Sequence, residues 1–355
     1  MFSRLYAPLF GLLTLVAIGC GDAGGDSGLK RIVFLNNTNS PFWDACREGI
    51  KEAEKDLKLR DAGLTAMMEV NDGTPSGQIE KLRQFRSQPD IVAVAISPIV
   101  ADNAAIAQEL RELRKKGVAV ICVDNDIAPD LRDSRQFYIG TDNVKGGRQL
   151  GKCAKALRPE GGEYVQFVGR TGAQNARERM DGFSEEVGEK FVEKARMADE
   201  ADRSKARDNV RDAITNFPEI DILVGIWSYN APAIVDVVKE KKRPDLTVVT
   251  FDAEKLAVDA MDEGHIHAMV VQNPFDMGYQ LVKVLKAVHE EDETTIKEMF
   301  PNQGKEGGDI YETGLKVVIP NDKSPVKHVE FDKATEVLTL DDFKKWLVKY
   351  NLESS

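Results

Sequence analysis

The stretch IVAVAISPIVADNAAIAQELRELRKKGVAVICVDND, residues 91–126, contains the unit from which the fold of this chain is built. Its two apolar runs, 91–96 and 118–123, lack the alternation of half-exposed strands, which is typical of parallel strands buried on both faces. Between them lies an amphipathic helical pattern over residues 101–116, with Gly117 where that helix should end. A strand, a helix and a second strand in this order predict an α/β fold with a doubly wound parallel sheet.

The same alternation extends over most of the 355 residues. Domains usually have about 100–200 residues, so we expect two lobes, each with a doubly wound parallel sheet. The acidic, weakly periodic segment 290–309 is interpreted as a surface loop, and 325–355 as a strand followed by an amphipathic helix over 340–350. The other predicted strands are residues 31–35, 64–70, 136–140, 162–168, 190–195, 222–226, 246–251 and 268–272, and the other predicted helices are residues 41–56, 76–88, 145–157, 178–189, 204–216, 231–242 and 274–290.

The first twenty residues have the features of an export signal. A positive charge precedes an apolar segment, residues 9–18, that is too short to span a bilayer. Residues 17–20, AIGC, resemble the lipobox of bacterial lipoproteins, in which the Cys thiol receives a diacylglycerol, although Ala stands where Leu is usual. We predict a lipoprotein signal peptide over residues 1–20, lipidation of Cys20 and a flexible tether over 21–29, with simple secretory cleavage as the alternative.

The composition excludes several classes of partner. A net charge of −11 and a pI near 5.1 argue against nucleic acid, which requires a basic face. After residue 20 no apolar run approaches the roughly 20 residues of a membrane span, so we expect membrane contact only through the lipid anchor. Neither the histidines nor the cysteines show metal-ligand spacing, and we assign no metal and no cofactor. The remaining cysteines, interpreted as small buried residues, are Cys46, Cys122 and Cys153.

Polar side chains follow nearly every predicted strand. Open parallel sheets bind ligands outside the carboxyl ends of their strands, so the residues directly after each apolar run are the informative ones. Most of them carry amides or carboxylates. These strand exits contain Asn36 and Asn37, then Asp124 and Asn125, then Trp227, Ser228 and Asn230, then Asp252, and finally Gln272.

Six motifs in register resemble the periplasmic sugar-binding proteins of ABC transporters, with the ribose-binding proteins as the nearest pattern. The motifs are N-x-P-F-aromatic (39–43), I-x-V-D (121–124), T-D-N-x-x-G-G (141–147), A-R-E-R-x-x-G-F (176–183), V-V-x-F-D (248–252) and V-Q-x-P-x-x-x-G (271–278). Each is weak by itself, but their common order over about residues 30–290 is specific. The resemblance implies the type I periplasmic binding protein fold, two lobes joined by a three-strand hinge near 138–141, 272–273 and 302. The implied lobes are 30–140 plus 273–302 and 141–272 plus 303–355.

The resemblance also implies a ligand-binding site in the cleft between the lobes. Phe42 and Trp43 would flank a sugar ring, because sugars present apolar C–H faces to aromatic side chains. Asp124, Arg179 and Asp252 would bind hydroxyl groups, the carboxylates as acceptors and the guanidinium as a planar donor. The polar shell would consist of Asn36, Asn37, Asn125, Ser228, Asn230 and Gln272.

Three positions depart from the ribose-binding pattern. Asn125 stands where that pattern has Arg, Ala201 replaces an aromatic residue of the second lobe, and Ser228 replaces an Asn. The sugar ring would then be stacked from one side only, or by Trp227 on the second side. The resemblance therefore implies a small sugar or a sugar-like polyol and leaves open which one.

The predicted function is that of a monomeric, extracytoplasmic solute-binding protein, located in the periplasm or at the cell surface, that presents its ligand to an ABC transporter permease. A ligand-sensing receptor for signalling or chemotaxis remains an alternative, because it would use the same closed form. A glycosidase is a weaker one, suggested only by the pair Asp124 and Asp252. We expect no enzymatic activity, and no glycine-rich dinucleotide motif follows the first strand.

Overall fold

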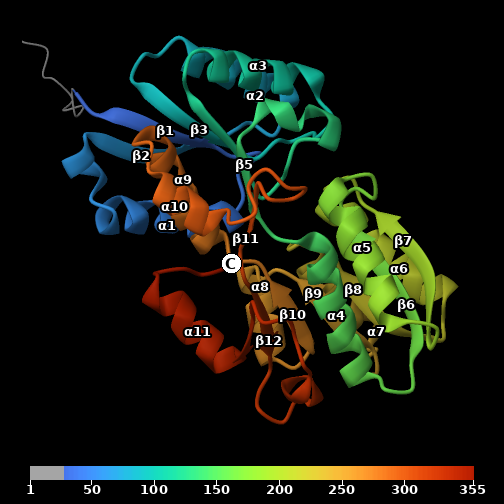
Figure 1. Ribbon diagram of the computed structural model, residues 1–355. Helices are drawn as coiled ribbons and strands as arrows, with labels where there is room; N and C mark the ends of the chain where they lie inside the picture. Colours follow the sequence, from blue (N-terminus) through green and yellow to red (C-terminus); the bar gives the residue numbers. More distant parts are fainter. Residues whose placement is uncertain (1–27) are drawn as a thin grey trace, which may run out of the picture.

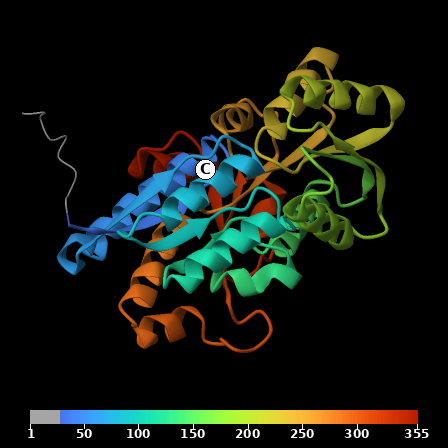
Figure 2. The same cartoon turned by 90° about the horizontal axis from the view of Figure 1, so that it is seen from above.

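Two separate β-sheets, each covered by helices on both faces, form the two lobes of the molecule (Figure 1). The computed structural model describes residues 28–355, so the predicted signal peptide, Cys20 and the tether as far as residue 27 lie outside the described residues. Figure 2 shows the same two lobes from a perpendicular direction. Within residues 28–355, no helix combines the length and the apolar character that a membrane span requires.

The first lobe is built on a six-stranded sheet. Its strands are β1 (Lys30–Leu35), β2 (Leu64–Glu69), β3 (Ile91–Ile96), β4 (Ala119–Val123), β5 (Phe137–Gly140) and β11 (Ile310–Glu312). Its helices are α1 (Phe42–Asp56), α2 (Pro75–Arg86), α3 (Ala104–Lys115), α9 (Pro274–His289) and α10 (Glu293–Met299), with the 3₁₀ helices η1 (Leu59–Ala62) and η2 (Pro129–Ser134). Apolar side chains of α1 and α9 pack on one face of the sheet, and those of α2 and α3 on the other (Figure 1).

The second lobe is built on a seven-stranded sheet. Its strands are β6 (Gly162–Val168), β7 (Phe191–Ala198), β8 (Ile220–Gly225), β9 (Thr247–Phe251), β10 (Ala268–Val271), β12 (Leu315–Ile319) and β13 (Thr335–Thr339). Its helices are α4 (Asn143–Leu157), α5 (Gln174–Val187), α6 (Arg203–Asn216), α7 (Asn230–Lys241), α8 (Lys255–Asp262) and α11 (Leu340–Lys349), with the 3₁₀ helix η3 (Pro325–His328). Here α4 and α5 cover one face, and α6, α7, α8 and α11 cover the other.

Both sheets repeat one strand order. The first runs β2-β1-β3-β4-β5 with β11 beyond β5, and the second runs β7-β6-β8-β9-β10 with β12 and β13 beyond β10. Neighbouring strands are parallel except for β10 and β12, an antiparallel pair that the sequence did not indicate. The predicted pair of mainly parallel, doubly wound sheets is therefore confirmed. In each sheet the order reverses beside the first strand, β1 or β6, where such folds form a ligand crevice.

The chain passes between the lobes three times, after β5, after β10 and after β11. The first two crossings lie where the motifs place them, but the third does not lie near residue 302. Residues 310–312 still belong to the first sheet, because Ile310 pairs with Tyr138 and Glu312 with Gly140. The third crossing is therefore at residues 313–314, where the Thr313 amide donates to the Gly140 carbonyl at 2.8 Å.

Segment 290–309 is not simply a surface loop, because it contains helix α10. Asp292 caps this helix by accepting the amide hydrogens of Thr294 and Thr295. Phe300 follows the helix and stacks on Phe137 with 4.1 Å between ring centroids. Only the last turn is buried, which is why the sequence showed so little periodicity. Helix α8 and strands β11 and β12 were also not predicted, whereas β13 and α11 confirm the expected strand and helix of the tail.

In each lobe, glycines allow two helices to approach closely. A Cβ at Gly278 of α9 would lie 2.0 Å from the Cys46 carbonyl oxygen of α1, and a Cβ at Gly147 of α4 would lie 2.1 Å from the Arg179 carbonyl oxygen of α5. Only glycine permits such contacts between backbones. Because α1 begins at Phe42 and α5 carries Arg179, these glycines help to set the positions of both side chains.

The cysteines of the described chain are buried and free, as expected for small apolar residues. Burial raises the pKa of Cys46, Cys122 and Cys153 far above the usual range, so they are unreactive thiols. No group of His, Cys, Asp and Glu side chains within residues 28–355 is arranged to hold a metal ion.

Candidate ligand-binding cleft

A cleft of about 1210 Å³ lies between the two lobes. Its walls come from segments that follow the carboxyl ends of strands in both sheets, as the doubly wound topology requires. The predicted residues that line it are Asn37, Phe42, Trp43, Asp124, Asn125, Arg179, Trp227, Ser228, Asp252 and Gln272.

Two predicted residues, Asn36 and Asn230, are not part of the cleft lining. The Asn36 Oδ1 accepts the amide hydrogen of Asn71 at 2.9 Å, which ties β1 to the loop after β2. The Asn230 Oδ1 accepts the Trp227 amide hydrogen at 3.0 Å, and its Nδ2 donates to Asp199 at 2.9 Å. Both side chains are buried and shape loops beside the cleft. From the sequence, a residue directly after a strand could have either this role or contact with the ligand.

The carboxylates of Asp124 and Asp252 occupy matching positions directly after β4 and β9. The residues are only 9% and 4% exposed, and both have a left-handed backbone, with φ of 66° and 64°. This conformation costs a non-glycine residue about 1 kcal/mol or more and is concentrated at functional sites. Two residues with this conformation at matching positions, both lining one cleft, make the pair a candidate part of the site.

Arg179 of α5 is a cation close to Asp252 whose charge also acts on Asp124. Its Nη1 lies 3.7 Å from Asp252 Oδ2, and its guanidinium carbon lies 4.0 Å from the centroid of the Phe251 ring. Nε donates to Asn143 Oδ1 at 2.9 Å and Nη1 to the Ile226 carbonyl at 3.3 Å. A guanidinium has five N–H donors, so these two bonds fix its plane and leave further donors for a ligand.

The electrostatics of the cleft are set by two buried carboxylates and one buried guanidinium. Burial raises the pKa of Asp124 to about 7, with the Arg179 charge opposing this rise and the Asp252 charge adding to it. Burial also raises the pKa of Asp252, against the lowering effects of Arg179 and of hydrogen bonds from Gln272. Hydroxyl groups that donate to these carboxylates would stabilise their ionised forms.

Gln272 connects the carboxylate of Asp252 to the first crossing between the lobes. Its Nε2 donates to the Asp252 oxygens at 3.1 and 3.2 Å, while its Oε1 accepts the hydroxyl hydrogen of Thr141 at 2.9 Å. Thr141 follows β5 and Gln272 follows β10, so this chain of bonds joins two crossings at the base of the cleft.

The aromatic residues have different roles. Trp43 is 2% exposed and packs in the core of the first lobe, where its Nε1 donates to Asn37 Oδ1 at 3.1 Å. Phe42 is half-buried and packs edge-on against Trp43, so it is the better placed ring for ligand contact. In the second lobe Trp227 packs over Gly169, and within residues 28–355 its buried Nε1 has no hydrogen-bond partner.

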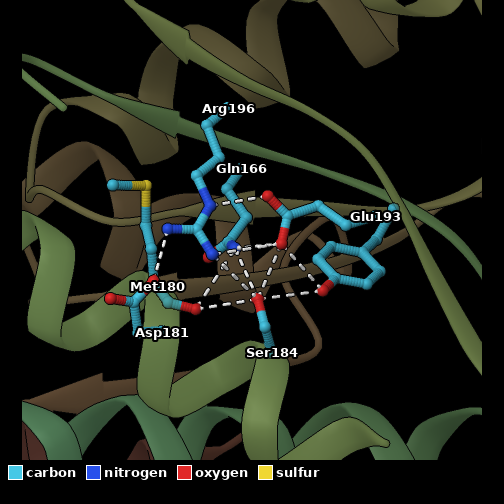
Figure 3. Close-up of polar contacts among 7 residues, drawn as sticks. Gln166, Met180, Asp181, Ser184, Glu193 and Arg196 are labelled. Carbon is cyan, nitrogen blue, oxygen red and sulfur yellow. Dashed lines mark hydrogen bonds and ion pairs between the residues drawn. The ribbon is translucent and has the colours of Figure 1, made fainter. Parts of the chain in front are cut away.

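A polar network on the far side of α5 fixes the helix that carries Arg179 (Figure 3). Gln166 of β6 and Ser184 both donate to the Met180 carbonyl, at 3.3 and 2.9 Å. The Ser184 hydroxyl also lies 2.7 Å from Glu193 Oε2 of β7, so its single hydrogen is shared between the two acceptors. Since Met180 directly follows Arg179, these bonds hold this turn of α5 against β6 and β7.

The predicted site residues omitted several polar residues of the cleft, among them Tyr138, Asn175 and Glu254. The Asn175 Nδ2 donates to Asn125 Oδ1 at 3.3 Å, which is a hydrogen bond across the cleft between the lobes. Glu254 accepts the Ser228 hydroxyl at 3.1 Å. Its position two residues after Asp252 was a usable signal, whereas Tyr138 lies within a strand and gave none.

Two α/β lobes that place hydrogen-bonding groups in one cleft define a two-lobed ligand-binding protein. The chain matches the model of the periplasmic binding protein domain over residues 32–293, and it belongs to this family.

The similar proteins have low sequence identity to this chain. The ribose import binding protein of Salmonella typhimurium is 22% identical over 258 residues, which cover 72% of this chain and 83% of the relative. The D-apiose import binding protein of Actinobacillus succinogenes is 24% identical over 268 residues, covering 72% and 80%. The solved structure of an ABC transporter solute-binding protein from Burkholderia graminis in complex with D-arabinose has a TM-score of 0.70 and 22% identity, covering 83% of this chain and 97% of that one.

Proposed function

We propose that this protein binds a monosaccharide or a small sugar-like polyol between its lobes and presents it to the permease of an ABC transporter. The observation that carries the proposal is the meeting of Asp124, Asp252 and Arg179 in one cleft. The names of the relatives, which import ribose and D-apiose, support the same ligand class. The family is one of binding proteins, and we assign no catalytic role to the two carboxylates.

Each group in the cleft suits a different part of a sugar. The carboxylates accept hydrogen bonds from hydroxyl groups, Arg179 donates to hydroxyl or ring oxygens, and Phe42 covers an apolar C–H face. Charge-assisted hydrogen bonds contribute about 1.5–3 kcal/mol each, so three or four reach the roughly 8 kcal/mol of a micromolar complex.

Ligand capture is proposed to proceed by closure of the lobes. The cleft volume exceeds the range of about 300–1,000 Å³ usual for sites that enclose a small ligand. Contacts to both lobes would favour a closed state, because a ligand shifts an equilibrium by its differential affinity for the two forms. The three crossings are the hinge, and the bond between Asn125 and Asn175 is the kind of contact that closure would strengthen.

The protein is proposed to work outside the cytoplasm, anchored through Cys20. Its family description as a periplasmic binding protein supports the compartment, and the AIGC sequence supports the anchor. The test is labelling of growing cells with radioactive palmitate. We expect label on the wild type and none on Cys20→Ser, and an unlabelled wild type would leave simple secretory cleavage.

A thermal-shift screen of pentoses, hexoses, polyols and sugar acids tests the ligand class, because a ligand that binds only the folded form raises its melting temperature. We expect neutral sugars or polyols to raise it and sugar acids to have no effect, since the cleft floor carries two carboxylates against one guanidinium. Calorimetry then gives the Kd of each positive compound. A flat response to every neutral compound would reject the proposal, and hydrolysis of a bound glycoside would favour the glycosidase alternative.

A further inference from the structure

The segment Tyr350–Ser355, named here the hinge strap, follows α11 and returns to the base of the cleft. In Figure 1 the end of the chain lies between the two lobes. Ser354 and Ser355 are buried, with exposures of only 7% and 3%. The strap lies outside residues 32–293, the part of the chain that matches the family.

One end of the strap contacts Ala253, which directly follows Asp252, and also Gln272. The Ala253 amide donates to the Ser355 carbonyl at 2.9 Å, and the Ser355 amide donates to the Ala253 carbonyl at 3.2 Å. The Ser355 hydroxyl donates to the Gln272 carbonyl at 3.4 Å. The strap thus pairs like a short strand with the residue after Asp252 and also contacts Gln272.

These bonds are well placed to maintain the strained backbone of Asp252. A left-handed non-glycine residue persists only when its surroundings fix it, and Asp252 is fixed before and after. Its own amide donates to the Val270 carbonyl at 2.8 Å, and the next residue is paired with Ser355. In the first lobe Tyr138 has the corresponding role, because its hydroxyl donates to the Asp124 carbonyl at 2.7 Å.

The other end of the strap reaches the first lobe. The centroids of the Tyr350 and Phe275 rings lie 4.2 Å apart. Phe275 belongs to α9, the helix that begins just after the second crossing. Helix α11 itself is held on the second lobe by Leu340, Phe343 and Leu347. The strap therefore spans the hinge, from a helix of the second lobe past α9 of the first to the floor of the cleft.

We propose that the hinge strap positions Asp252 and Gln272 for ligand binding, so that residues far outside the matched domain determine the affinity of the cleft. Its ligand-binding consequence rests on the proposed function, whereas its effect on the backbone around Asp252 does not.

The test compares three variants with the wild type and with Val348→Ala, an exposed position on α11 that serves as the control. A stop after Lys349 removes the strap, Ser355→Pro removes the amide that donates to Ala253, and Ser355→Ala keeps the backbone pairing. We expect roughly tenfold weaker sugar binding after truncation, an intermediate loss for Ser355→Pro, and a change below about threefold for Ser355→Ala and Val348→Ala. Ser355→Ala loses the hydroxyl but keeps the backbone bonds, so near wild-type binding by this variant would show that the backbone pairing matters and the side chain does not.

Amide hydrogen exchange of the ligand-free proteins provides a readout that does not need the sugar. The amides of Ala253 and Gln272 should exchange faster in the truncated protein and in Ser355→Pro than in the wild type. Unchanged exchange and unchanged affinity in a folded truncated protein would overturn the proposal, and if truncation prevents folding, Ser355→Pro decides by the same criteria. If the wild type binds no sugar, the proposed function fails and the exchange data alone decide whether the strap holds Asp252.

Discussion

Asp124 and Asp252 have matching backbones but different neighbours. Asp252 accepts hydrogen bonds from both the side-chain Nε2 and the backbone amide of Gln272, and its Oδ2 lies 3.7 Å from Arg179 Nη1. Within residues 28–355 no amide donates to the Asp124 carboxylate, whose hydrogen-bond partner is the Ser97 side chain, and the neighbouring Asn125 accepts a bond from Asn175 across the cleft. The charge of a single guanidinium therefore acts on both carboxylates, and we expect ligand binding to depend most on Arg179.

Replacement of Arg179 should weaken sugar binding strongly. We expect Arg179→Ala to raise the Kd at least about tenfold through loss of charge-assisted hydrogen bonds, and Arg179→Lys to recover only part of it because the planar fork is absent. Calorimetry measures the Kd, and Arg148→Ala is the control, since Arg148 pairs with Glu185 on the exposed surface of α4. Wild-type affinity for Arg179→Ala would show that the ligand lies elsewhere in the cleft.

The raised pKa of Asp124 predicts an unusual pH dependence of stability. A carboxyl group with a pKa of about 7 when folded and about 3.9 when unfolded binds more protons in the folded state between these values. The free energy of unfolding of the wild type should therefore fall, relative to Asp124→Asn, as the pH rises from about 4 to about 7, and then level off. Urea denaturation of both proteins between pH 4 and 8 measures this difference.

The comparison with Asp124→Asn removes the contributions of other groups, such as His267, whose pKa burial lowers. Asn tolerates the left-handed backbone at this position, so the variant is a conservative one. Bound hydroxyl groups stabilise the ionised carboxylate, and we expect the affinity of the wild type for sugar to increase as the pH rises through 7. A difference in stability that does not vary with pH would mean that Asp124 is ionised throughout.

At the level of helices and strands, the site depends on close helix pairs. Gly147 lets α4 lie against the Arg179 carbonyl of α5, and the polar network around Ser184 fixes the opposite side of α5. The position of the guanidinium is therefore set by the backbone as much as by its own hydrogen bonds.

Gly147→Ala should disturb this arrangement. The new methyl group would lie 2.1 Å from the Arg179 carbonyl oxygen, and such overpacking costs about 1–3 kcal/mol. Denaturant unfolding should show that loss, and calorimetry should show weaker sugar binding because α5 moves. Lys155→Ala, on the exposed side of the same helix, is the control and should change neither value appreciably. A destabilised variant with unchanged affinity for sugar would show that the position of α5 does not affect ligand binding.

Many of the helices and strands could be predicted from the sequence. Strands β3 and β6 match the predicted ranges residue for residue, because buried parallel strands are continuous apolar runs bounded by turn residues. Helix α10 and strand β11 could not, because only their contacts with Phe137 and β5 distinguish them from a polar loop.

For the whole molecule, the predicted consequence of ligand binding is closure about the three crossings. Small-angle scattering should show a smaller radius of gyration when saturating sugar is added to the wild type. Asp252→Ala, at the same sugar concentration, should show little change because its affinity is reduced. An identical scattering curve with and without a sugar that calorimetry shows to be bound would exclude closure as the mechanism.

The sequence by itself determined the repeating strand and helix units, the two lobes and the positions of Asp124 and Asp252 directly after their strands. It could do so because parallel strands end at a common edge, so a residue directly after a buried run has a predictable place. Only the tertiary structure decided that Asn36 and Asn230 support loops, that the third crossing lies at 313–314, and that Ser355 pairs with Ala253. Those features depend on contacts between segments far apart in the chain, and no local periodicity records such contacts.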